Sequence, residues 1–219
     1  MLVDNCEFPP DDYFDVENSV WLREIGNSRC RIGINSVLLF LAGRLNKIGL
    51  KTELRKVASM QMIGTIESNR YFGAVRCPVE GEISAFNLDL LSDPRPVNDS
   101  PYENGWFAEI TGYDPSALSK LDFGESARTK LESRIRELKV KCMKVLPDEQ
   151  MFSIGIECST TFSNLGEILA NKPAGHIVHL VTDEPTAGIE MIRWSIQTKN
   201  EIVEERKEEK LFHFLVRKA

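Results

Sequence analysis

Hydrophobic residues change their spacing along the chain, and the first change separates residues 14–112 from the remainder of the sequence. In this stretch the apolar residues form short runs, such as 31–34, 60–64 and 81–86, with Gly, Pro and Asn residues close to them. Short runs with frequent turn residues are typical of a β-sandwich or a β-barrel. We therefore expect an all-β domain in the first half of the chain.

A helical period occupies residues 125–146. Apolar residues recur near the helical spacing at Leu131, Ile135, Leu138, Met143 and Leu146. Lys, Arg and Glu residues occupy the other side of the pattern, so it predicts an amphipathic helix that stops before Pro147. Such a helix either packs against one domain and connects it to the next, or binds a partner protein.

Residues 151–217 alternate between strand and helix patterns. We expect strands over 151–157, 176–182, 201–205 and 211–217, and helices over 162–171 and 185–198. In the second of these helices, Ile189, Ile192 and Ile196 are expected on the inner face. The order βαβαββ predicts a two-layer sandwich with both helices on one face of a mixed sheet.

These patterns together predict the α+β fold class. Residues 8–112 are assigned to the β domain and residues 113–149 to a connecting segment that contains the amphipathic helix. Residues 150–219 are assigned to the α/β domain.

Composition and charge limit the cellular location of the protein and the classes of partner that it can bind. The 219-residue chain has a formal net charge of −6, which argues against a nucleic-acid-binding surface. No apolar run approaches the ~20 residues that a membrane span needs, and the first residues do not form a secretory signal, so we expect a cytoplasmic protein without membrane contact. The cysteines are Cys6, Cys30, Cys77, Cys142 and Cys158. They are scattered, with no Cys-x-x-Cys pair, so we expect neither a disulfide framework nor a metal site.

A series of motifs in the first half resembles a known family. In order, these are Phe8-Pro9-Pro10-Asp11, Tyr13, Trp21, Ile32-Gly33-Ile34, Leu41-Ala42-Gly43, Gly64-Thr65-Ile66-Glu67-Ser68, Pro78-Val79-Glu80-Gly81-Glu82-Ile83, Asn87 and Pro101-Tyr102-Glu103-Asn104-Gly105-Trp106. The series resembles the H protein of the glycine cleavage system over residues 8–112. This resemblance implies a flattened β-barrel of the hammerhead type, with a lysine at a hairpin tip that carries lipoate through an amide.

The lysine on which that carrier function depends is missing. The family pattern Glu-Ser-x-Lys appears here as Glu67-Ser68-Asn69-Arg70, and no lysine lies between Lys56 and Lys120. A guanidinium stays protonated and is a poor nucleophile, so we expect no lipoyl group and no other cofactor. Arg70 is then either a solvated hairpin residue or part of a retained docking surface.

A docking surface on the 66–76 hairpin would be formed by Arg70, Tyr71, Phe72 and Arg76. Arginine and aromatic side chains are enriched at protein interfaces, which is the basis for this alternative. We therefore keep a protein-binding role of the hairpin as a hypothesis.

The second half resembles the TusA-like sulfur carriers over residues 150–218. The resemblance is carried by the βαβαββ order, by Gly155-Ile156-Glu157-Cys158, by Asp183-Glu184-Pro185, by Ile192-Arg193-Trp194 and by the segments 200–203 and 212–217. It implies that Cys158 bears a persulfide at the N-terminus of a helix, where a thiolate is stabilised.

The family's Cys-Pro-x-Pro motif is altered to Cys158-Ser159-Thr160-Thr161, and both prolines are missing. There are two alternatives for the start of the helix. Either one of the hydroxyl residues 159–161 caps the helix and keeps Cys158 at its start, or Asn164 and Glu167 form a capping box and the helix begins later. The sequence leaves both possibilities open.

Other catalytic chemistry has little support in the sequence. There is no Gly-rich phosphate loop and no G-x-S-x-G motif, and no triad is indicated, so the pattern does not decide whether the protein is an enzyme. His176, His179 and His213 are expected to be packed or surface residues rather than metal ligands.

Two functions remain. The favoured one is a non-lipoylated, H-protein-like sulfur carrier that acts through Cys158 with protein donors and acceptors. The alternative is a catalytically inactive adaptor that docks on a partner complex through the 66–76 hairpin.

Overall fold

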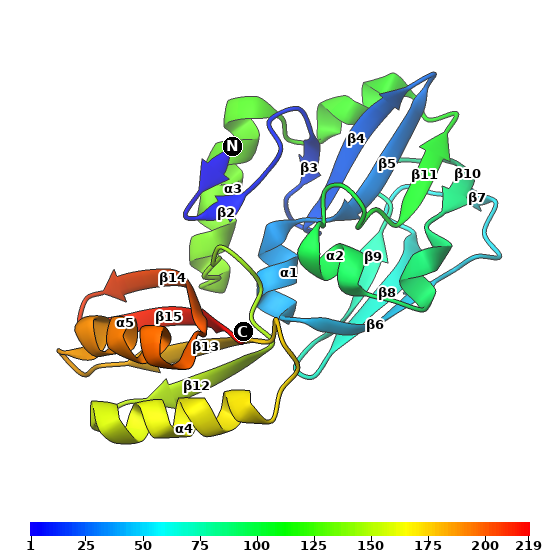
Figure 1. The fold of residues 1–219 in the computed structure, drawn as a ribbon. Helices are drawn as coiled ribbons and strands as arrows, with labels where there is room; N and C mark the ends of the chain where they lie inside the picture. Colours follow the sequence, from blue (N-terminus) through cyan, green and yellow to red (C-terminus); the bar gives the residue numbers. More distant parts are fainter. The chain divides into compact units, whose positions relative to one another are not determined.

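The structure is a computed structural model that describes all 219 residues. Its internal contacts divide the chain into two compact units, Met1–Cys142 and Met143–Ala219. The division falls inside the segment 113–149 that the sequence pattern assigns to a connector. Both units combine helices and strands, so the protein has the mixed α and β content that was predicted (Figure 1).

Antiparallel sheets dominate the first unit. The larger sheet has the order β3-β4-β5-β11-β10-β7 and consists of β3 (Tyr13–Asp15), β4 (Val20–Gly26), β5 (Arg29–Ile34), β7 (Lys56–Val57), β10 (Gly81–Phe86) and β11 (Ala108–Thr111). The second has the order β6-β8-β9 and consists of β6 (Leu45–Leu50), β8 (Met62–Ser68) and β9 (Phe72–Arg76). A hairpin of β1 (Leu2–Val3) and β2 (Cys6–Glu7) precedes them. The hammerhead arrangement of these sheets stays a prediction.

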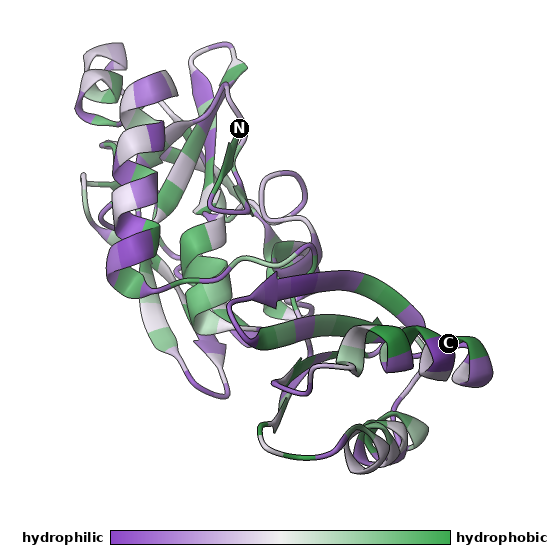
Figure 2. Ribbon diagram, turned by 90° about the vertical axis from the view of Figure 1, so that its left-hand side faces the viewer, coloured by the Kyte–Doolittle hydropathy of each residue, from purple (hydrophilic) through white to green (hydrophobic).

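A buried helix, α1 (Ser36–Ala42), interrupts the region where the sequence pattern predicts only strands. Asn35 caps it, because its Oδ1 accepts hydrogen bonds from the N–H groups of Val37 and Leu38 at 3.1 and 3.3 Å. The helix ends at Gly43, whose φ of 76° and ψ of −169° suit only glycine. Since α1 is hydrophobic along most of its length (Figure 2), it shows no polar face that would reveal a helical period.

Short helical segments connect the strands of the first unit. They are η1 (Leu88–Leu91), α2 (Arg95–Asp99) and η2 (Pro115–Lys120). Asp114 caps η2, since its side chain accepts a hydrogen bond from the Ser116 N–H at 2.8 Å.

The amphipathic helix, α3 (Gly124–Leu138), is shorter than predicted. Lys139 adopts a left-handed conformation with φ of 52°, and the Val140 N–H donates to the Ile135 carbonyl at 3.0 Å. This arrangement terminates the helix eight residues before the predicted end at residue 146. The inner residues Ala127, Leu131 and Ile135 are buried in a core cluster of the first unit, so the helix packs against that domain.

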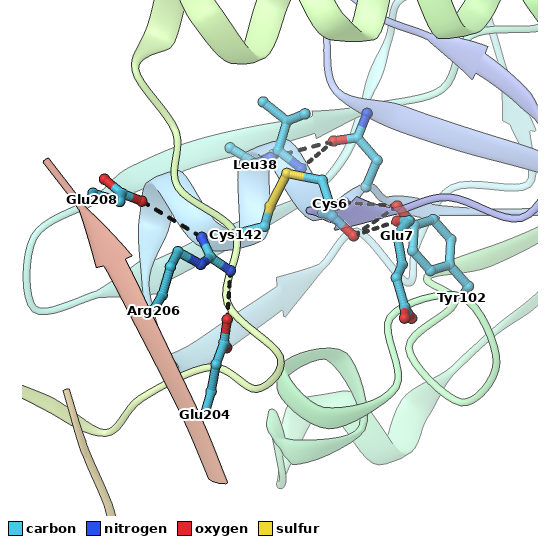
Figure 3. Close-up of a disulfide and its surroundings, with 11 residues drawn as sticks. Cys6, Glu7, Leu38, Tyr102, Cys142, Glu204, Arg206 and Glu208 are labelled. Atoms are coloured by element: carbon cyan, nitrogen blue, oxygen red, sulfur yellow. Dashed lines mark hydrogen bonds and ion pairs between the residues drawn. A yellow bond between two sulfur atoms is a disulfide. The ribbon is translucent and has the colours of Figure 1, made fainter. Parts of the chain in front are cut away.

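A disulfide joins Cys6 and Cys142, although the scattered cysteines argue against a disulfide framework. It joins β2 to the segment after α3 (Figure 3) and is buried, with Cys6 0% and Cys142 1% exposed. The two cysteines are 136 residues apart, so no local spacing motif points to the pair. Packing of α3 beside the N-terminal hairpin brings them together, and both belong to the same core cluster.

The second unit has the predicted order βαβαββ. Its four-stranded sheet has the order β12-β13-β15-β14 and consists of β12 (Glu149–Ser153), β13 (Ile177–Thr182), β14 (Glu201–Glu208) and β15 (Leu211–Arg217). Strands β12 and β13 are parallel and the other pairs are antiparallel. Helices α4 (Cys158–Ala170) and α5 (Ala187–Thr198) share one core cluster with the sheet residues Val178, Leu180, Phe214 and Val216.

The inner face of α5 differs from the prediction. Ile189, Ile192 and Ile196 are exposed at 63%, 51% and 74%, whereas Ala187 and Met191 are fully buried. Both sets follow a helical spacing, so periodicity alone could not tell which set faces the sheet. The sheet packs on the side that carries Ala187 and Met191 and leaves a row of isoleucines in water.

No helix in either unit is both long enough and apolar enough to span a membrane.

Candidate functional site

The hairpin of β8 and β9 places Arg70 at its exposed tip. Strands β8 and β9 pair from Met62 and Arg76 to Glu67 and Phe72, which leaves residues 69–71 in the turn. The Arg70 side chain folds back on the end of α1: its Nε donates to the Ala42 carbonyl at 3.2 Å and its Nη2 to the Phe40 carbonyl at 3.0 Å. Carbonyl groups at a helix C-terminus lack helical partners and carry partial negative charge, so a guanidinium is well suited to cap them.

Neighbouring residues reinforce this contact between the hairpin and α1. Ser68 Oγ also donates to the Ala42 carbonyl, at 2.7 Å. A side chain at Gly43 would meet the Arg70 guanidinium, because a Cβ there would lie 2.9 Å from its Nε. The Arg70 guanidinium therefore caps the end of α1 instead of extending into solvent.

The other hairpin residues of the proposed docking surface have different environments. Phe72 is 71% exposed and is thus the largest apolar surface of the hairpin. Arg76 is exposed and donates from Nη1 to the Met60 carbonyl at 3.0 Å, and Tyr71 is half-buried with its ring against Gly73. The hairpin thus presents one exposed aromatic ring and two arginines that are already bonded to backbone carbonyls.

In the second unit, Cys158 is the first residue of α4. The Thr161 N–H donates to the Glu157 carbonyl at 3.0 Å, so the helix starts at Cys158 and not at the alternative capping box of Asn164 and Glu167. No side chain caps this start, although the sequence offers three hydroxyl residues directly after the cysteine. The thiol is half-buried and packs against the core cluster between the helices and the sheet.

A short hydrogen-bond chain links the thiol to the loop before α5. Cys158 Sγ lies 3.5 Å from Thr186 Oγ1, and Thr186 Oγ1 donates to Glu184 Oε1 at 3.2 Å. A hydroxyl has one proton, so while it donates to Glu184 it accepts from the Cys158 thiol. Sequence reasoning did not find Thr186, because a lone threonine in a loop carries no motif.

Two buried hydroxyls near this helix start have no hydrogen-bond partner, Ser153 Oγ and Thr161 Oγ1. Both residues are 1% exposed, at the end of β12 and in the first turn of α4. Unsatisfied buried hydroxyls are rare in folded proteins, and they cost free energy until a donor or acceptor reaches them.

The other free cysteines, Cys30 and Cys77, are fully buried in the first unit. Burial raises the pKa of the Cys30 thiol to about 12 and that of the Cys77 thiol to about 11. Since the thiolate is the reactive form, these two side chains are poor nucleophiles at neutral pH.

A buried histidine pair lies on the sheet of the second unit. His179 Nε2 lies 3.0 Å from His213 Nδ1, and the rings stack at a centroid distance of 5.2 Å. Burial and the neighbouring His213 lower the pKa of His179 to about 4, so His179 is neutral at pH 7. The sequence analysis placed each histidine in the fold separately and missed the contact, which spans 34 residues. No group of three or more histidine, cysteine or carboxylate side chains is arranged so that it could hold a metal ion.

The geometry of the first unit defines a class of protein: a β-rich domain with an exposed hairpin at its candidate attachment or docking site. Its sequence identifies the family. The chain belongs to the glycine cleavage H-protein family, whose model matches residues 12–134. The resemblance seen in the first half of the sequence is thereby confirmed at the level of the family.

Two curated relatives illustrate the match. A probable glycine cleavage system H protein 2 from Sulfurisphaera tokodaii is 32% identical over 145 residues, which are 65% of this chain and 98% of that protein. Glycine cleavage system H protein 3 from Aquifex aeolicus is 34% identical over 143 residues, which are 64% of this chain and 89% of that protein. Among solved structures, a glycine cleavage system H protein from Mycobacterium marinum aligns with a TM-score of 0.44 and 21% identity, over 52% of this chain and 97% of that chain.

Lipoate does not fit the residues at the hairpin tip. The position that the resemblance assigns to the acylated lysine is Arg70, and its guanidinium is occupied by the carbonyls of Ala42 and Phe40. It offers no amine for an amide bond. The family match ends at residue 134, before the second unit and its Cys158.

Proposed function

We propose that the protein carries sulfane sulfur as a persulfide on Cys158, while its H-protein-like domain serves as a docking module without a lipoyl group. The observation that carries this proposal is the place of Cys158 at the first position of α4, with the Thr186 hydroxyl 3.5 Å from its Sγ. The first N–H groups of a helix lack helical partners and the helix dipole is positive there, which favours an anionic sulfur atom.

The transfer chemistry needs only a donor persulfide. The Cys158 thiolate attacks the outer sulfur of the donor, the sulfur–sulfur bond of the donor breaks, and the donor leaves as a thiolate. One sulfur atom moves without any net oxidation, and Cys158 becomes a perthiol that a second thiolate can attack in the same way. The Thr186 hydroxyl can accept from the thiol and, after rotation, donate to the anionic sulfur.

The resemblance to TusA-like carriers adds support by analogy of fold. The βαβαββ order and the cysteine at the start of the first helix match what that resemblance implies. The two missing prolines leave residues 159–161 as the first turn, and a regular helix still begins at Cys158.

Cold cyanolysis tests the proposal, because cyanide removes protein-bound sulfane sulfur as thiocyanate. After incubation with polysulfide and removal of the excess, the protein should release about one thiocyanate per chain. C158S should release almost none, whereas the double variant C30S/C77S should match the unmodified protein because those thiols are buried. Equal release from C158S and the unmodified protein would remove the sulfur-carrier function.

The adaptor function is a second candidate, favoured by the exposed ring of Phe72 on a hairpin without an acylable lysine. In this case the partner is a protein of a multienzyme complex, and the hairpin residues Arg70, Tyr71, Phe72 and Arg76 form the contact. A pull-down that survives C158S but is weakened by R70E or F72S supports the adaptor. Capture of the partner that is lost in C158S but retained in R70E and F72S supports the carrier function.

A further inference from the structure

Exposed apolar side chains in the second unit gather in the loop before Cys158 and along α5. Ile154 and Ile156 are 51% and 36% exposed in the four-residue loop between β12 and α4. Ile189, 63% exposed, lies in the first turn of α5, three residues after Thr186. Apolar side chains grouped in water mark an interaction surface, because their burial against a partner is favourable.

Two hydrogen bonds hold the two loops together. Asp183 Oδ1 accepts the Gly155 N–H at 2.7 Å, so the loop that carries Ile154 and Ile156 is fixed to the loop before α5. The contact between Cys158 Sγ and Thr186 Oγ1 joins the same two loops at the thiol. The apolar residues and the cysteine therefore belong to one surface at the carboxyl ends of the parallel strands β12 and β13, where α4 begins (Figure 1).

The charged residues of the two loops have one sign. The loops 154–157 and 183–186 contain three carboxylates, Glu157, Asp183 and Glu184, and no lysine or arginine. Lys207, with its Nζ 4.9 Å from the Phe212 ring, and Glu205, beside Gly188, lie at the same end of the sheet and balance each other, as do Glu209 and Lys210 in the adjoining turn. A negative, partly apolar surface is complementary to a positive, partly apolar one.

We infer that residues 154–157 and 183–189 form a docking surface for a cationic partner protein. This partner presents its own cysteine to Cys158, and the partner's cysteine lies between apolar residues that are flanked by lysine or arginine. The inference rests on the proposed function, since it names the class of donor or acceptor that Cys158 would serve. It also accounts for the three carboxylates of the two loops, which attract a cationic protein and repel anionic small thiols.

Peptide disulfides test the surface without any persulfide. Two synthetic probes, Lys-Leu-Cys-Leu-Lys and Glu-Leu-Cys-Leu-Glu, are each activated as a mixed disulfide with thionitrobenzoate. The Cys158 thiolate attacks the peptide sulfur, the mixed disulfide breaks, and the coloured thionitrobenzoate leaves. We expect the cationic probe to react about tenfold faster than the anionic probe at low ionic strength, and the ratio to approach one at high salt.

The ratio of the two rates isolates docking from any effect on the thiol itself. E157Q/E184Q should lower the ratio severalfold, and I154S should slow both probes. The matched control E167Q changes a carboxylate that is exposed on α4 but outside the two loops, and it should leave the ratio unchanged.

Equal rates for the two probes, a ratio that does not respond to E157Q/E184Q, or no reaction with either probe would overturn the docking surface. Cyanolysis reports the persulfide separately. A charge-selective reaction without persulfide formation therefore supports the docking surface and removes the carrier function. Persulfide formation without a charge-selective reaction supports the carrier function and removes the docking surface.

Discussion

At the scale of single residues, Arg70 is the position on which the proposed loss of the lipoyl group rests. Its place in an exposed hairpin turn agrees with the expectation drawn from the resemblance of Glu67-Ser68-Asn69-Arg70 to the family pattern. The capping of α1 by Arg70 was not predictable, since α1 itself carries no helical period. The chemistry of the position could thus be inferred from residue identity, but its structural role needed the fold.

Restoring the lysine tests the assignment of this position. We expect R70K, coexpressed with a lipoate ligase, to gain the mass of one lipoyl group, because an exposed amine then stands at the hairpin tip. The unmodified protein should gain nothing. R76K, with its lysine at the base of the same hairpin, is the matched control and should also stay unmodified. Lipoylation of the unmodified protein would contradict the account.

His179 makes stability depend on pH. Its pKa is about 4 in the folded protein and close to 6.5 when unfolded, so the unfolded chain binds more protons between these values. The stability that comes from the neutral ring is complete above pH 6.5 and is lost as the pH falls towards 4, by up to about 3 kcal/mol. Urea unfolding at pH 7, 6 and 5 should show this loss, and H179F should flatten it. An identical slope in H179F would exclude His179 as its source.

At the scale of elements, the fold was predictable wherever one hydrophobic pattern dominated. The six elements of the second unit appear in the predicted order. The errors occur where two patterns compete or where contacts are remote: α5 carries two apolar rows and buries the one with Met191, and α3 ends early at Lys139. The helix start at Cys158 also needed the structure, because the sequence allowed two capping arrangements.

Gly43 tests the contact between α1 and the hairpin. G43A should lower the free energy of unfolding by about 1–3 kcal/mol, because an alanine is strained at this φ and ψ and its Cβ meets the Arg70 guanidinium. Gly112 also has a positive φ but open space around it, so G112A is a reference for an alanine at positive φ without a clash. Thermal denaturation should show a larger loss for G43A. If G43A lost less stability than G112A, the contact between the new Cβ and the Arg70 guanidinium would not contribute to the destabilisation.

The disulfide is the second test at this scale. Removing it by C6S/C142S should destabilise the first unit by about 2–4 kcal/mol, because the bond closes a very long loop in the unfolded chain. Chemical denaturation with and without reductant should show the loss in the unmodified protein, while the double serine variant should not respond to reductant. Unchanged stability on reduction would show that the bond does not form or does not contribute.

At the scale of the whole molecule, the chain combines an H-protein family domain with a second compact unit that the family match does not reach. The second unit buries its own core between two helices and four strands. A fragment of residues 143–219 should therefore fold alone and unfold cooperatively in urea, as measured by circular dichroism. A fragment without a cooperative transition would show that its core is incomplete.

The central claim is that Cys158 alone carries the sulfur. Peptide mass spectrometry, after exposure of the folded protein to polysulfide and rapid alkylation, measures persulfide at each cysteine separately. We expect high occupancy at Cys158, discharge by excess thiol, and almost no persulfide at Cys30 or Cys77. Persulfide that is absent from Cys158, or spread evenly over the three thiols, would contradict it.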